Sequence, residues 1–288
     1  MTFPATPEEF RKILKARNLR LNKALGQCFL VDSNYLDALV RWSGITAQDE
    51  IIELGTGAGH LTSRLCDAAA RVWSFEVDPA IHALARDLLG SRSNLRLILA
   101  DGASFETLAR PSPAHRLLLV SNLPYSDYER LLLKAFSSEM GFDSYFLMVQ
   151  RDVFQRLKAG PGTPGYGPLG VLLQGLGTLR LIQRAGPALF HPRPRVDSAF
   201  FVLKRNPDSR VKPRQIPALY QALRHLFAHR RKLLKAALHE IEERRGPLPA
   251  SVWANGGKRV EALSPEALLE LAALVAAMGI SAQNLPKF

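Results

Sequence analysis

The chain has 288 residues, 47% of them hydrophobic, which is enough for one large globular domain and a smaller one. Its formal net charge of +12 predicts a polyanionic partner, either nucleic acid or an anionic membrane surface. The start of the chain lacks the apolar segment of a signal peptide, and the longest apolar stretch, residues 271–280, is too short to cross a bilayer. The sequence therefore favours nucleic acid and does not support a membrane role.

Only two cysteines are present, Cys28 and Cys66. They form neither a CxxC pair nor a disulfide framework. This usage suits a reducing compartment. We expect a cytoplasmic monomer that holds no metal.

The first predicted helix lies within residues 7–23, where apolar and basic side chains alternate and the helix runs into a basic arm that includes Lys23. Such a charge run is commonly a solvated helix face, and only the basic character of the whole chain favours a contact with nucleic acid. The following Gly26 and Gln27 form either an ordinary loop or an irregular lid over a ligand. Asp32 then caps the next helix, and Asp78 with Pro79 opens a later one.

A glycine turn follows the first predicted strand. The strand covers residues 50–54, the turn residues 55–59, and a helix begins after it. Glycines in this position let the backbone approach a ligand at the helix N-terminus. The third glycine of a dinucleotide-binding fingerprint would fall at His60, so the NAD fingerprint is broken.

Two acidic residues follow the next two predicted strands. Glu76 ends the strand at residues 72–75 and is placed to bind the ribose hydroxyls of a nucleoside cofactor. Asp101 ends the strand at residues 95–99 and suits an adenine amino group. Each acid alone can be a helix cap or a surface charge. Together with the glycine turn they mark the strand ends at which open α/β sheets bind ligands.

The next strand ends at an Asn-Leu-Pro-Tyr segment, residues 122–125. Asn122 offers a side-chain acceptor, Pro124 adds no N–H donor, and Tyr125 offers a ring on which a base can stack. Leu123 precedes the proline and is biased towards an extended conformation. These residues form either a nucleobase pocket or an ordinary strand-to-loop turn, and alone they favour the two interpretations equally.

The chain then continues with alternating strands and helices. Phe190 lies beside Arg193 and Arg195 in a loop that prolines stiffen. A glycine- and proline-rich loop at residues 159–167 is interpreted as an edge of the site that can move. The predicted strands cover residues 117–120, 144–149, 179–183 and 199–204, and the predicted helices residues 128–136 and 150–157.

Residues 206–213 are rich in proline and charge and predict a domain boundary. The pattern beyond them is helical, with Gly279 as a predicted cap near the end. Basic residues on the first two of these helices are either solvent-exposed residues without a binding role or, with Arg193 and Arg195, a surface that contacts the phosphates of a nucleic acid. The predicted helices cover residues 216–227, 231–243, 251–254 and 265–278.

Taken in order, these segments resemble the ribosomal RNA adenine dimethyltransferases. The resemblance covers nearly the whole chain. Single motifs are shared by many methyltransferases, whereas the ordered set is specific. The matching segments are residues 25–27, 53–62, 122–125, 148–150, 190–199, 230–232 and 259–263.

The resemblance implies S-adenosylmethionine-dependent dimethylation of N6 on two adjacent adenosines near the 3′ end of small-subunit rRNA, with a role in small-subunit biogenesis. It implies an α/β, Rossmann-like class I methyltransferase sheet in residues 1–205, with residues 1–24 as a basic arm. A smaller, all-helical RNA-binding domain is expected in residues 206–288. The expected partner is ribosomal RNA within a small-subunit assembly intermediate. The residues implied to line the S-adenosylmethionine site are Gln27, Cys28, Leu30, Gly55, Glu76, Asp101 and Asn122.

For catalysis we expect positioning and electrostatics, because no strong base is visible at the site. The Asn122 side-chain oxygen and the Leu123 carbonyl would accept the two hydrogens of the adenine N6 amine. Tyr125 and Phe190 would stack on the two faces of the flipped base. The residues expected to bind RNA are Arg193, Arg195, Arg224, Arg230, Arg231, Lys232 and Lys235.

The chain departs from the family pattern at three places. Cys28 stands where the family usually has Asn, which removes a polar cofactor contact, and Thr56 replaces a usual Pro. Asp127 and Glu129 put acidic groups where RNA is expected to enter. One alternative is a large-subunit rRNA methylase of the antibiotic-resistance type, which the segment at residues 197–199 and the helical region disfavour. The other is a non-catalytic RNA- or DNA-binding relative that acts as an assembly or transcription factor.

Overall fold

The computed structural model describes residues 3–22, 25–108, 114–209 and 211–278. Lys23 of the predicted arm and Gly279, the predicted cap, lie outside these residues. Contacts divide the chain into two compact units, Met1–Arg151 with Arg180–Lys204 and Asp152–Leu179 with Arg205–Phe288. Residues 152–179, which the sequence places in the first domain, thus group with the C-terminal helices.

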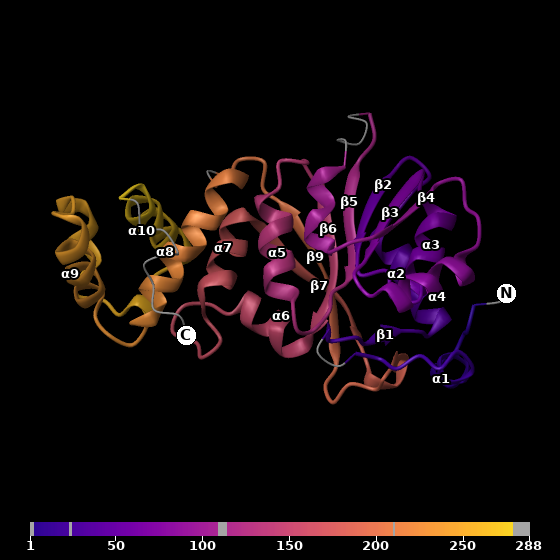
Figure 1. Ribbon diagram of the computed structural model, residues 1–288. Helices are drawn as coiled ribbons and strands as arrows, with labels where there is room; N and C mark the ends of the chain where they lie inside the picture. Colours follow the sequence, from indigo (N-terminus) through magenta and orange to yellow (C-terminus); the bar gives the residue numbers. More distant parts are fainter. Residues whose placement is uncertain (1–2, 23–24, 109–113, 210, 279–288) are drawn as a thin grey trace. The chain divides into compact units, whose positions relative to one another are not determined.

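A seven-stranded sheet in the order β4-β3-β2-β5-β6-β9-β7 forms the centre of the first unit (Figure 1). Neighbours among β2 to β6 run parallel, and β9 runs antiparallel to β6. The chain extends from β2 to β3 and β4 on one side and to β5 and β6 on the other, so the order reverses between β2 and β5. Ligands of open α/β sheets bind at this point, beyond the strands' C-terminal ends. The strands are β2 (Glu50–Leu54), β3 (Arg71–Glu76), β4 (Leu95–Leu99), β5 (Leu117–Asn122), β6 (Ser144–Gln150), β7 (Gly177–Ala185) and β9 (Ser198–Arg205).

Capping side chains begin two of the helices where the sequence predicts them. Asp32 Oδ1 accepts a hydrogen bond from the Tyr35 amide at 2.8 Å, and Asp78 Oδ1 accepts one from the Ala80 amide at 2.9 Å. Each satisfies an amide that the first helical turn leaves without an intrahelical partner. The helices of this unit are α1 (Pro7–Ala16), α2 (Ser33–Ser43), α3 (His60–Ala68), α4 (Pro79–Leu89) and α5 (Tyr128–Ser137).

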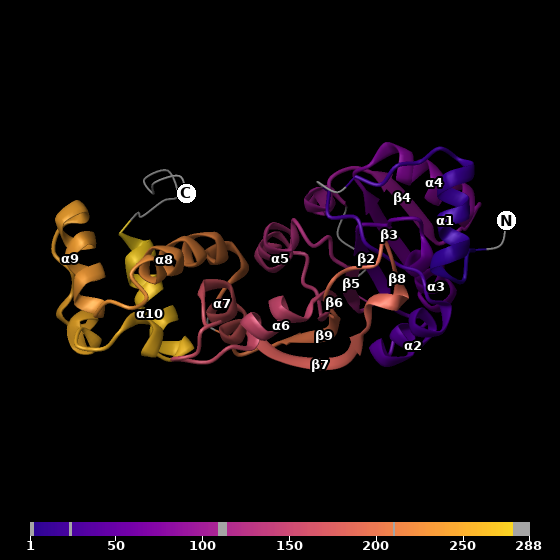
Figure 2. The same ribbon diagram turned by 90° about the horizontal axis from the view of Figure 1, so that it is seen from below.

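Two apolar clusters hold these helices in place. α2 packs beside α3 (Figure 2), and leucines of both helices bury against Ile51, Val72 and Leu118 of the sheet. α1 is anchored by Phe10, which is fully buried in a cluster with Phe29 and apolar residues of α4. Burial of each large apolar side chain contributes about 1.5–3 kcal/mol. The predicted amphipathic helix is therefore a packed part of the first unit.

A second, two-stranded sheet was not predicted. β1 (Phe29–Leu30) pairs antiparallel with β8 (Phe190–His191), with Leu30 opposite Phe190. Strands of two residues show no periodicity, so no sequence pattern can reveal them. The pairing brings the segment around Cys28 to the loop that follows Phe190.

The second unit is mainly helical in the part that the structure describes. It includes α7, which was not predicted, because its continuous apolar run shows no helical periodicity. α7 packs against α8 and α10. Within the described residues, no helix is both long enough and apolar enough to cross a membrane. The helices are α6 (Arg151–Lys158), α7 (Pro168–Leu176), α8 (Ile216–Ala228), α9 (Leu234–Arg245) and α10 (Pro265–Ala277).

Candidate cofactor and nucleobase site

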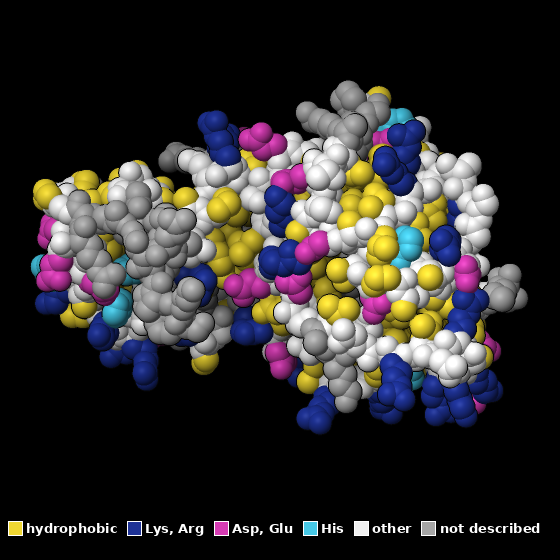
Figure 3. All heavy atoms as spheres, viewed as in Figure 1, with side chains coloured by type: hydrophobic (Ala, Val, Ile, Leu, Met, Phe, Trp, Pro, Cys, Tyr) yellow, Lys and Arg dark blue, Asp and Glu magenta, His cyan; other side chains and the backbone are white. Residues whose placement is uncertain are grey.

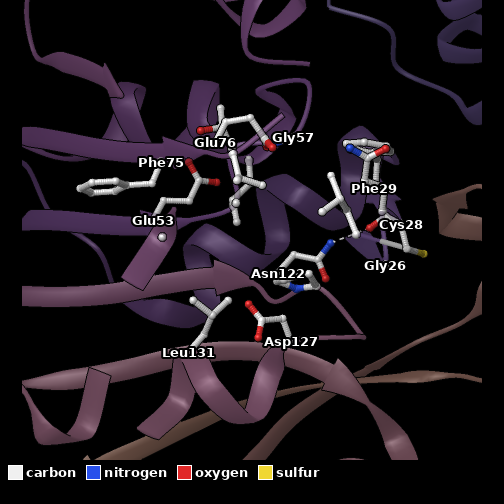
Figure 4. A pocket seen from close by; sticks show the side chains of 18 of the residues that line it. Gly26, Cys28, Phe29, Glu53, Gly57, Phe75, Glu76, Asn122, Asp127 and Leu131 are labelled. Carbon is white, nitrogen blue, oxygen red and sulfur yellow. Dashed lines mark hydrogen bonds between the residues drawn. The ribbon is translucent and has the colours of Figure 1, made fainter. Parts of the chain in front are cut away.

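A cavity of about 430 Å³ lies beyond the C-terminal ends of β2, β3, β4 and β5. This size is within the usual range for small-molecule sites. All seven residues that the sequence implies for the cofactor line this one cavity, although they come from five separate segments. They are Gln27, Cys28, Leu30, Gly55, Glu76, Asp101 and Asn122. Figure 4 labels Cys28, Glu76 and Asn122 among them.

The glycine turn forms a tight wall of the cavity. Gly57 has φ of 57°, and a Cβ atom there would lie 2.7 Å from Cδ1 of Phe29. A side chain at this position is excluded both by the backbone conformation and by the close approach. The turn leads directly into the N-terminus of α3, whose free amides favour polar and anionic groups of a ligand.

Glu76 lies beside this turn at the end of β3. Its Oε2 accepts a hydrogen bond from the Gly57 amide at 2.8 Å, and its Oε1 accepts one from the Asp78 amide at 3.0 Å. Burial raises the pKa of Glu76, while the two amides oppose this shift. Each carboxylate oxygen keeps a further lone pair, so the group can accept hydrogen bonds from ribose hydroxyls.

The acidic residues at the mouth of the cavity share one cation. Arg130 donates through Nη2 to Asp101 Oδ1 at 3.0 Å and through Nε and Nη2 to Asp127. Partial burial opposes ionisation of Asp101, but the hydrogen bonds from Arg130 and from the Ala103 amide lower its pKa. The charge of Asp127, expected near the RNA entrance, is therefore compensated by its neighbour.

Asn122 has only the nitrogen end of its side-chain amide bonded to another residue in the described part of the chain. Nδ2 donates to the Cys28 carbonyl oxygen at 3.0 Å, as the dashed line in Figure 4 shows. Oδ1 is buried and accepts no hydrogen bond from the described residues. The adjacent Leu123 carbonyl likewise accepts none within the described part of the chain. Two residues adjacent in the chain thus each offer an acceptor, and a buried acceptor such as Asn122 Oδ1 is costly unless a ligand supplies a donor.

Tyr125 is held by its hydroxyl, which lies 2.6 Å from Ser198 Oγ. The neighbouring Cys28 thiol donates to the Pro192 carbonyl oxygen at 3.4 Å. Burial raises the pKa of the Cys28 thiol to about 11 and also raises the pKa of Tyr125. Neither group is ionised at neutral pH, so neither provides a nucleophile or a base there.

Phe190 does not offer a stacking face, which corrects the expectation from the sequence. Its side chain is 1% exposed and packs in the apolar cluster with Leu30 and Leu36. The pairing of β8 with β1 turns the ring towards this core. Tyr125 is half-buried and remains the candidate for stacking on a base, while its neighbours Pro124 and Ser126 line the cavity.

Glu53 is a cavity residue that was missed. It is 1% exposed, and its Oε2 accepts hydrogen bonds from Thr62 Oγ1 and Ser74 Oγ, both at 2.6 Å. Burial raises the pKa of Glu53 to about 8. Thr56 Oγ1 lies 2.6 Å from Ser74 Oγ, so the residue that replaces the family's proline joins this network. The sequence signal that could have identified Glu53 is an acidic residue within an otherwise apolar strand.

The residues expected to bind RNA differ in their surroundings. Arg193 and Arg195 are exposed in the loop between β8 and β9. Arg230 is used internally: it donates to Glu261 Oε2 at 2.8 Å and to the carbonyl oxygens of Pro164 and Thr163 at 3.1 and 3.2 Å. We therefore assign Arg230 to the structure of the second unit. The exposed members there are Arg224, Arg231, Lys232 and Lys235.

Comparison with known proteins agrees with this geometry. The family model described as "Ribosomal RNA adenine dimethylase" matches residues 18–276. A "Ribosomal RNA small subunit methyltransferase A" of Halothermothrix orenii is 30% identical over 243 residues, 83% of this chain and 81% of that protein. The protein of the same name from Listeria innocua is 34% identical over 235 residues, 80% of each chain. The crystal structure of a dimethyladenosine transferase from Plasmodium falciparum shares the fold, with a TM-score of 0.68, 21% identity and coverage of 86% of this chain and 97% of that one.

Proposed function

Because this chain belongs to the ribosomal RNA adenine dimethylase family, we propose that it dimethylates N6 of two adjacent adenosines near the 3′ end of small-subunit rRNA. The observation that carries the proposal is the buried Oδ1 of Asn122, an acceptor that no described residue supplies with a donor, at the edge of the cofactor cavity. The relatives from Halothermothrix and Listeria are both named for the small subunit, which disfavours the large-subunit alternative. A cavity lined by all seven residues expected to hold the cofactor disfavours a non-catalytic relative.

The residues that line the cavity suit S-adenosylmethionine in their chemistry. Glu76 can accept hydrogen bonds from ribose hydroxyls, and Asp101 can accept one from the adenine amine. The glycine turn has no side chains at its glycines, so the ligand can approach its backbone closely. The thiol of Cys28 replaces the polar side chain that the family usually has at this position. The backbone carbonyl of Cys28 still accepts a hydrogen bond from Asn122 and holds it in place. Bound S-adenosylmethionine supplies an electrophilic methyl group attached to a positively charged sulfur.

The protein's part in the reaction is to hold and orient the amine. Asn122 Oδ1 and the Leu123 carbonyl accept the two N6 hydrogens, which draws the nitrogen lone pair out of the purine ring and aims it at the cavity. Tyr125 holds the base by stacking, for which about 1–3 kcal/mol is typical. Positioning of this kind lowers a barrier by about 7–11 kcal/mol at most. The proton that N6 loses on methylation passes to water.

Exposed basic residues supply the surface for the RNA backbone. Arg193 and Arg195 lie in the loop whose Pro192 contacts Cys28, next to the nucleobase site. α1 lies beside β8 and adds its exposed Arg11 and Lys15. Figure 3 shows Lys and Arg side chains gathered along the lower edge of the first unit, where Figure 1 places α1. In the second unit, Arg224, Arg231, Lys232 and Lys235 add phosphate contacts.

We propose that the substrate is a small-subunit assembly intermediate in the cytoplasm and that the protein acts as a monomer. The test is incubation with radiolabelled S-adenosylmethionine and undermethylated small subunits, large subunits or free rRNA, followed by mapping of the label. We expect two methyl groups on each of two adjacent adenosines of the small-subunit rRNA and none with Asn122→Ala. Label in large-subunit rRNA, or no transfer to any of the three substrates, would overturn the proposal.

A further inference from the structure

Arg130 occupies the rim of the cofactor cavity together with two carboxylates. It lies in the first turn of α5, and Arg130, Asp101 and Asp127 all line the cavity. Its Nη2 bonds Asp101 Oδ1 at 3.0 Å, and its Nε lies 2.9 and 3.1 Å from the two oxygens of Asp127. The guanidinium thus connects the loop after β4 with the start of the helix that follows residues 122–125.

These ion pairs are too exposed to serve mainly for stability. The side chains of Arg130 and Asp101 are 50% and 49% exposed, and that of Asp127 is 36% exposed. Pairs in such positions typically contribute about 0–1 kcal/mol to folding. The ion pairs of Arg130 therefore act mainly on the orientation and charge of Asp101.

Arg130 determines which oxygen of Asp101 is left to bind a ligand. Oδ1 accepts both the Arg130 Nη2–H and the Ala103 amide, the latter at 2.8 Å. Oδ2 accepts no hydrogen bond from the residues that the structure describes. Two donors on one oxygen restrict rotation of the carboxylate and keep the other oxygen available as an acceptor.

We propose that Arg130 is a positioning residue for cofactor recognition: it holds Asp101 so that Oδ2 accepts the purine 6-amino group, and Asp127 holds Arg130. The inference rests on the proposed use of S-adenosylmethionine. One cation between two carboxylates leaves the cluster with a net negative charge, which favours a 6-amino donor over a 6-oxo acceptor. Asp127, a departure from the family pattern, thereby takes part in cofactor selection instead of repelling RNA.

The test compares two ligands that differ only at the purine 6-position and in the hydrogen that the 6-oxo form carries on N1. S-adenosylhomocysteine carries the 6-amino group, and S-inosylhomocysteine carries a 6-oxo group in its place. Their affinities for the full-length protein are measured by isothermal titration calorimetry. We expect the wild type to prefer S-adenosylhomocysteine by at least about 10-fold, because a site built around an acceptor rejects a ligand that lacks the donor.

Three variants separate positioning from general damage. Arg130→Ala should weaken S-adenosylhomocysteine about 5- to 20-fold and change S-inosylhomocysteine less than about twofold, so that the preference shrinks. The ligand preference of Arg130→Lys should lie between that of the wild type and that of Arg130→Ala. The ammonium group keeps the positive charge but lacks the planar fork that spans both carboxylates. Lys134→Ala is the matched control: it removes a cation from the same helix, one that pairs with Glu106 and does not line the cavity.

The outcomes distinguish this inference from the proposed function. If the wild type binds S-adenosylhomocysteine and Arg130→Ala keeps the full preference, the positioning role is wrong and the proposed function stands. An equal loss of both ligands in Arg130→Ala would also overturn the role, because it indicates a damaged cavity. If the wild type binds neither ligand, the failure lies with the proposed function.

Discussion

The side-chain amide of Asn122 donates to the Cys28 carbonyl oxygen over 3.0 Å, and this contact determines the direction of the whole group. A carbonyl can only accept, so the end of the amide that faces it must be the NH₂. Oδ1 is then necessarily the end turned away, where it is buried without a donor among the described residues. The irregular segment before β1 therefore does more than cover the cavity: its backbone orients the group that we expect to bind the target amine.

Two substitutions at Asn122 test this orientation. Asn122→Ala removes the acceptor and should lower kcat/KM for undermethylated small subunits by at least about 100-fold, as loss of one preorganised polar group typically does. Cofactor binding, measured with S-adenosylhomocysteine by calorimetry, should be weakened but detectable. Asn122→Asp keeps the size but places a carboxylate oxygen against the Cys28 carbonyl, so it should be as inactive as Asn122→Ala. Full activity in either variant would contradict the mechanism.

The close approach of the glycine turn to Phe29 predicts a second effect. Gly57 and Gly44 both have positive φ, 57° and 60°, but only at Gly57 would a Cβ atom meet another residue within 4 Å. Gly44→Ala should therefore lower the free energy of unfolding by about 1–2 kcal/mol and leave affinity for S-adenosylhomocysteine unchanged. Gly57→Ala should lower the free energy of unfolding by more than this and reduce the affinity for S-adenosylhomocysteine at least about 10-fold. Denaturant unfolding measures the stability and calorimetry the affinity. Equal effects of the two variants would exclude a specific role for the close approach of Gly57 to Phe29.

The buried carboxyl of Glu53 predicts a pH dependence of stability. Burial raises its pKa in the folded protein to about 8 from an ordinary value of 4.5. Between these values the folded state keeps a proton that the unfolded state has lost, so stability decreases as the pH rises. Glu53→Gln removes this dependence and can still accept from Thr62 and Ser74. It should match the wild type near pH 5 and be more stable near pH 7, by on the order of 2–3 kcal/mol.

The measurement is the difference in unfolding free energy between Glu53→Gln and the wild type, followed from about pH 5 to pH 9. Other titrating groups are common to both proteins, so they cancel in the difference. The difference should increase up to about pH 8 and then level off, because above the folded pKa both states of the wild type are ionised. A difference that is constant with pH would show that Glu53 is ionised throughout.

Local signals in the sequence were sufficient for most of the first unit. Asp32 and Asp78 cap α2 and α4 as predicted, because a cap depends only on residues within one helical turn. The strand-end acids Glu76 and Asp101 and the glycine turn come together because parallel strands share one carboxyl edge. Recognition of this edge required only the order of the elements along the chain.

The sequence does not show a residue's surroundings where these come from distant segments. Phe190 is buried because β8 pairs with β1, more than a hundred residues earlier in the chain. Arg230 is engaged by Glu261 and by the carbonyls of residues 163 and 164, none of which is its neighbour in sequence. An aromatic ring and an arginine look alike in a sequence whether they face solvent or the interior. Such tertiary contacts cannot be read from residue type and spacing.

The different surroundings of Arg230 and of its two neighbours predict opposite phenotypes. Arg230→Ala removes hydrogen bonds to a carboxylate and to two carbonyls, so it should lower the free energy of unfolding by about 1–3 kcal/mol. Its effect on the salt dependence of RNA binding should be small, because the charge is already paired. Arg231 and Lys232 are exposed, and their joint replacement by Ala should change stability by less than about 0.5 kcal/mol.

Joint replacement of Arg231 and Lys232 should instead weaken RNA binding and flatten its salt dependence. Each phosphate contact contributes roughly 0.7–0.9 to the slope of log K against log salt, so two lost contacts should reduce the slope by about 1.5. Lys212→Ala with Arg214→Ala removes the same charge from exposed positions of the same unit and serves as the control. If the control flattens the slope equally, the effect is one of net charge. If neither pair changes it, Arg231 and Lys232 are solvated surface residues and the RNA path must follow the first unit.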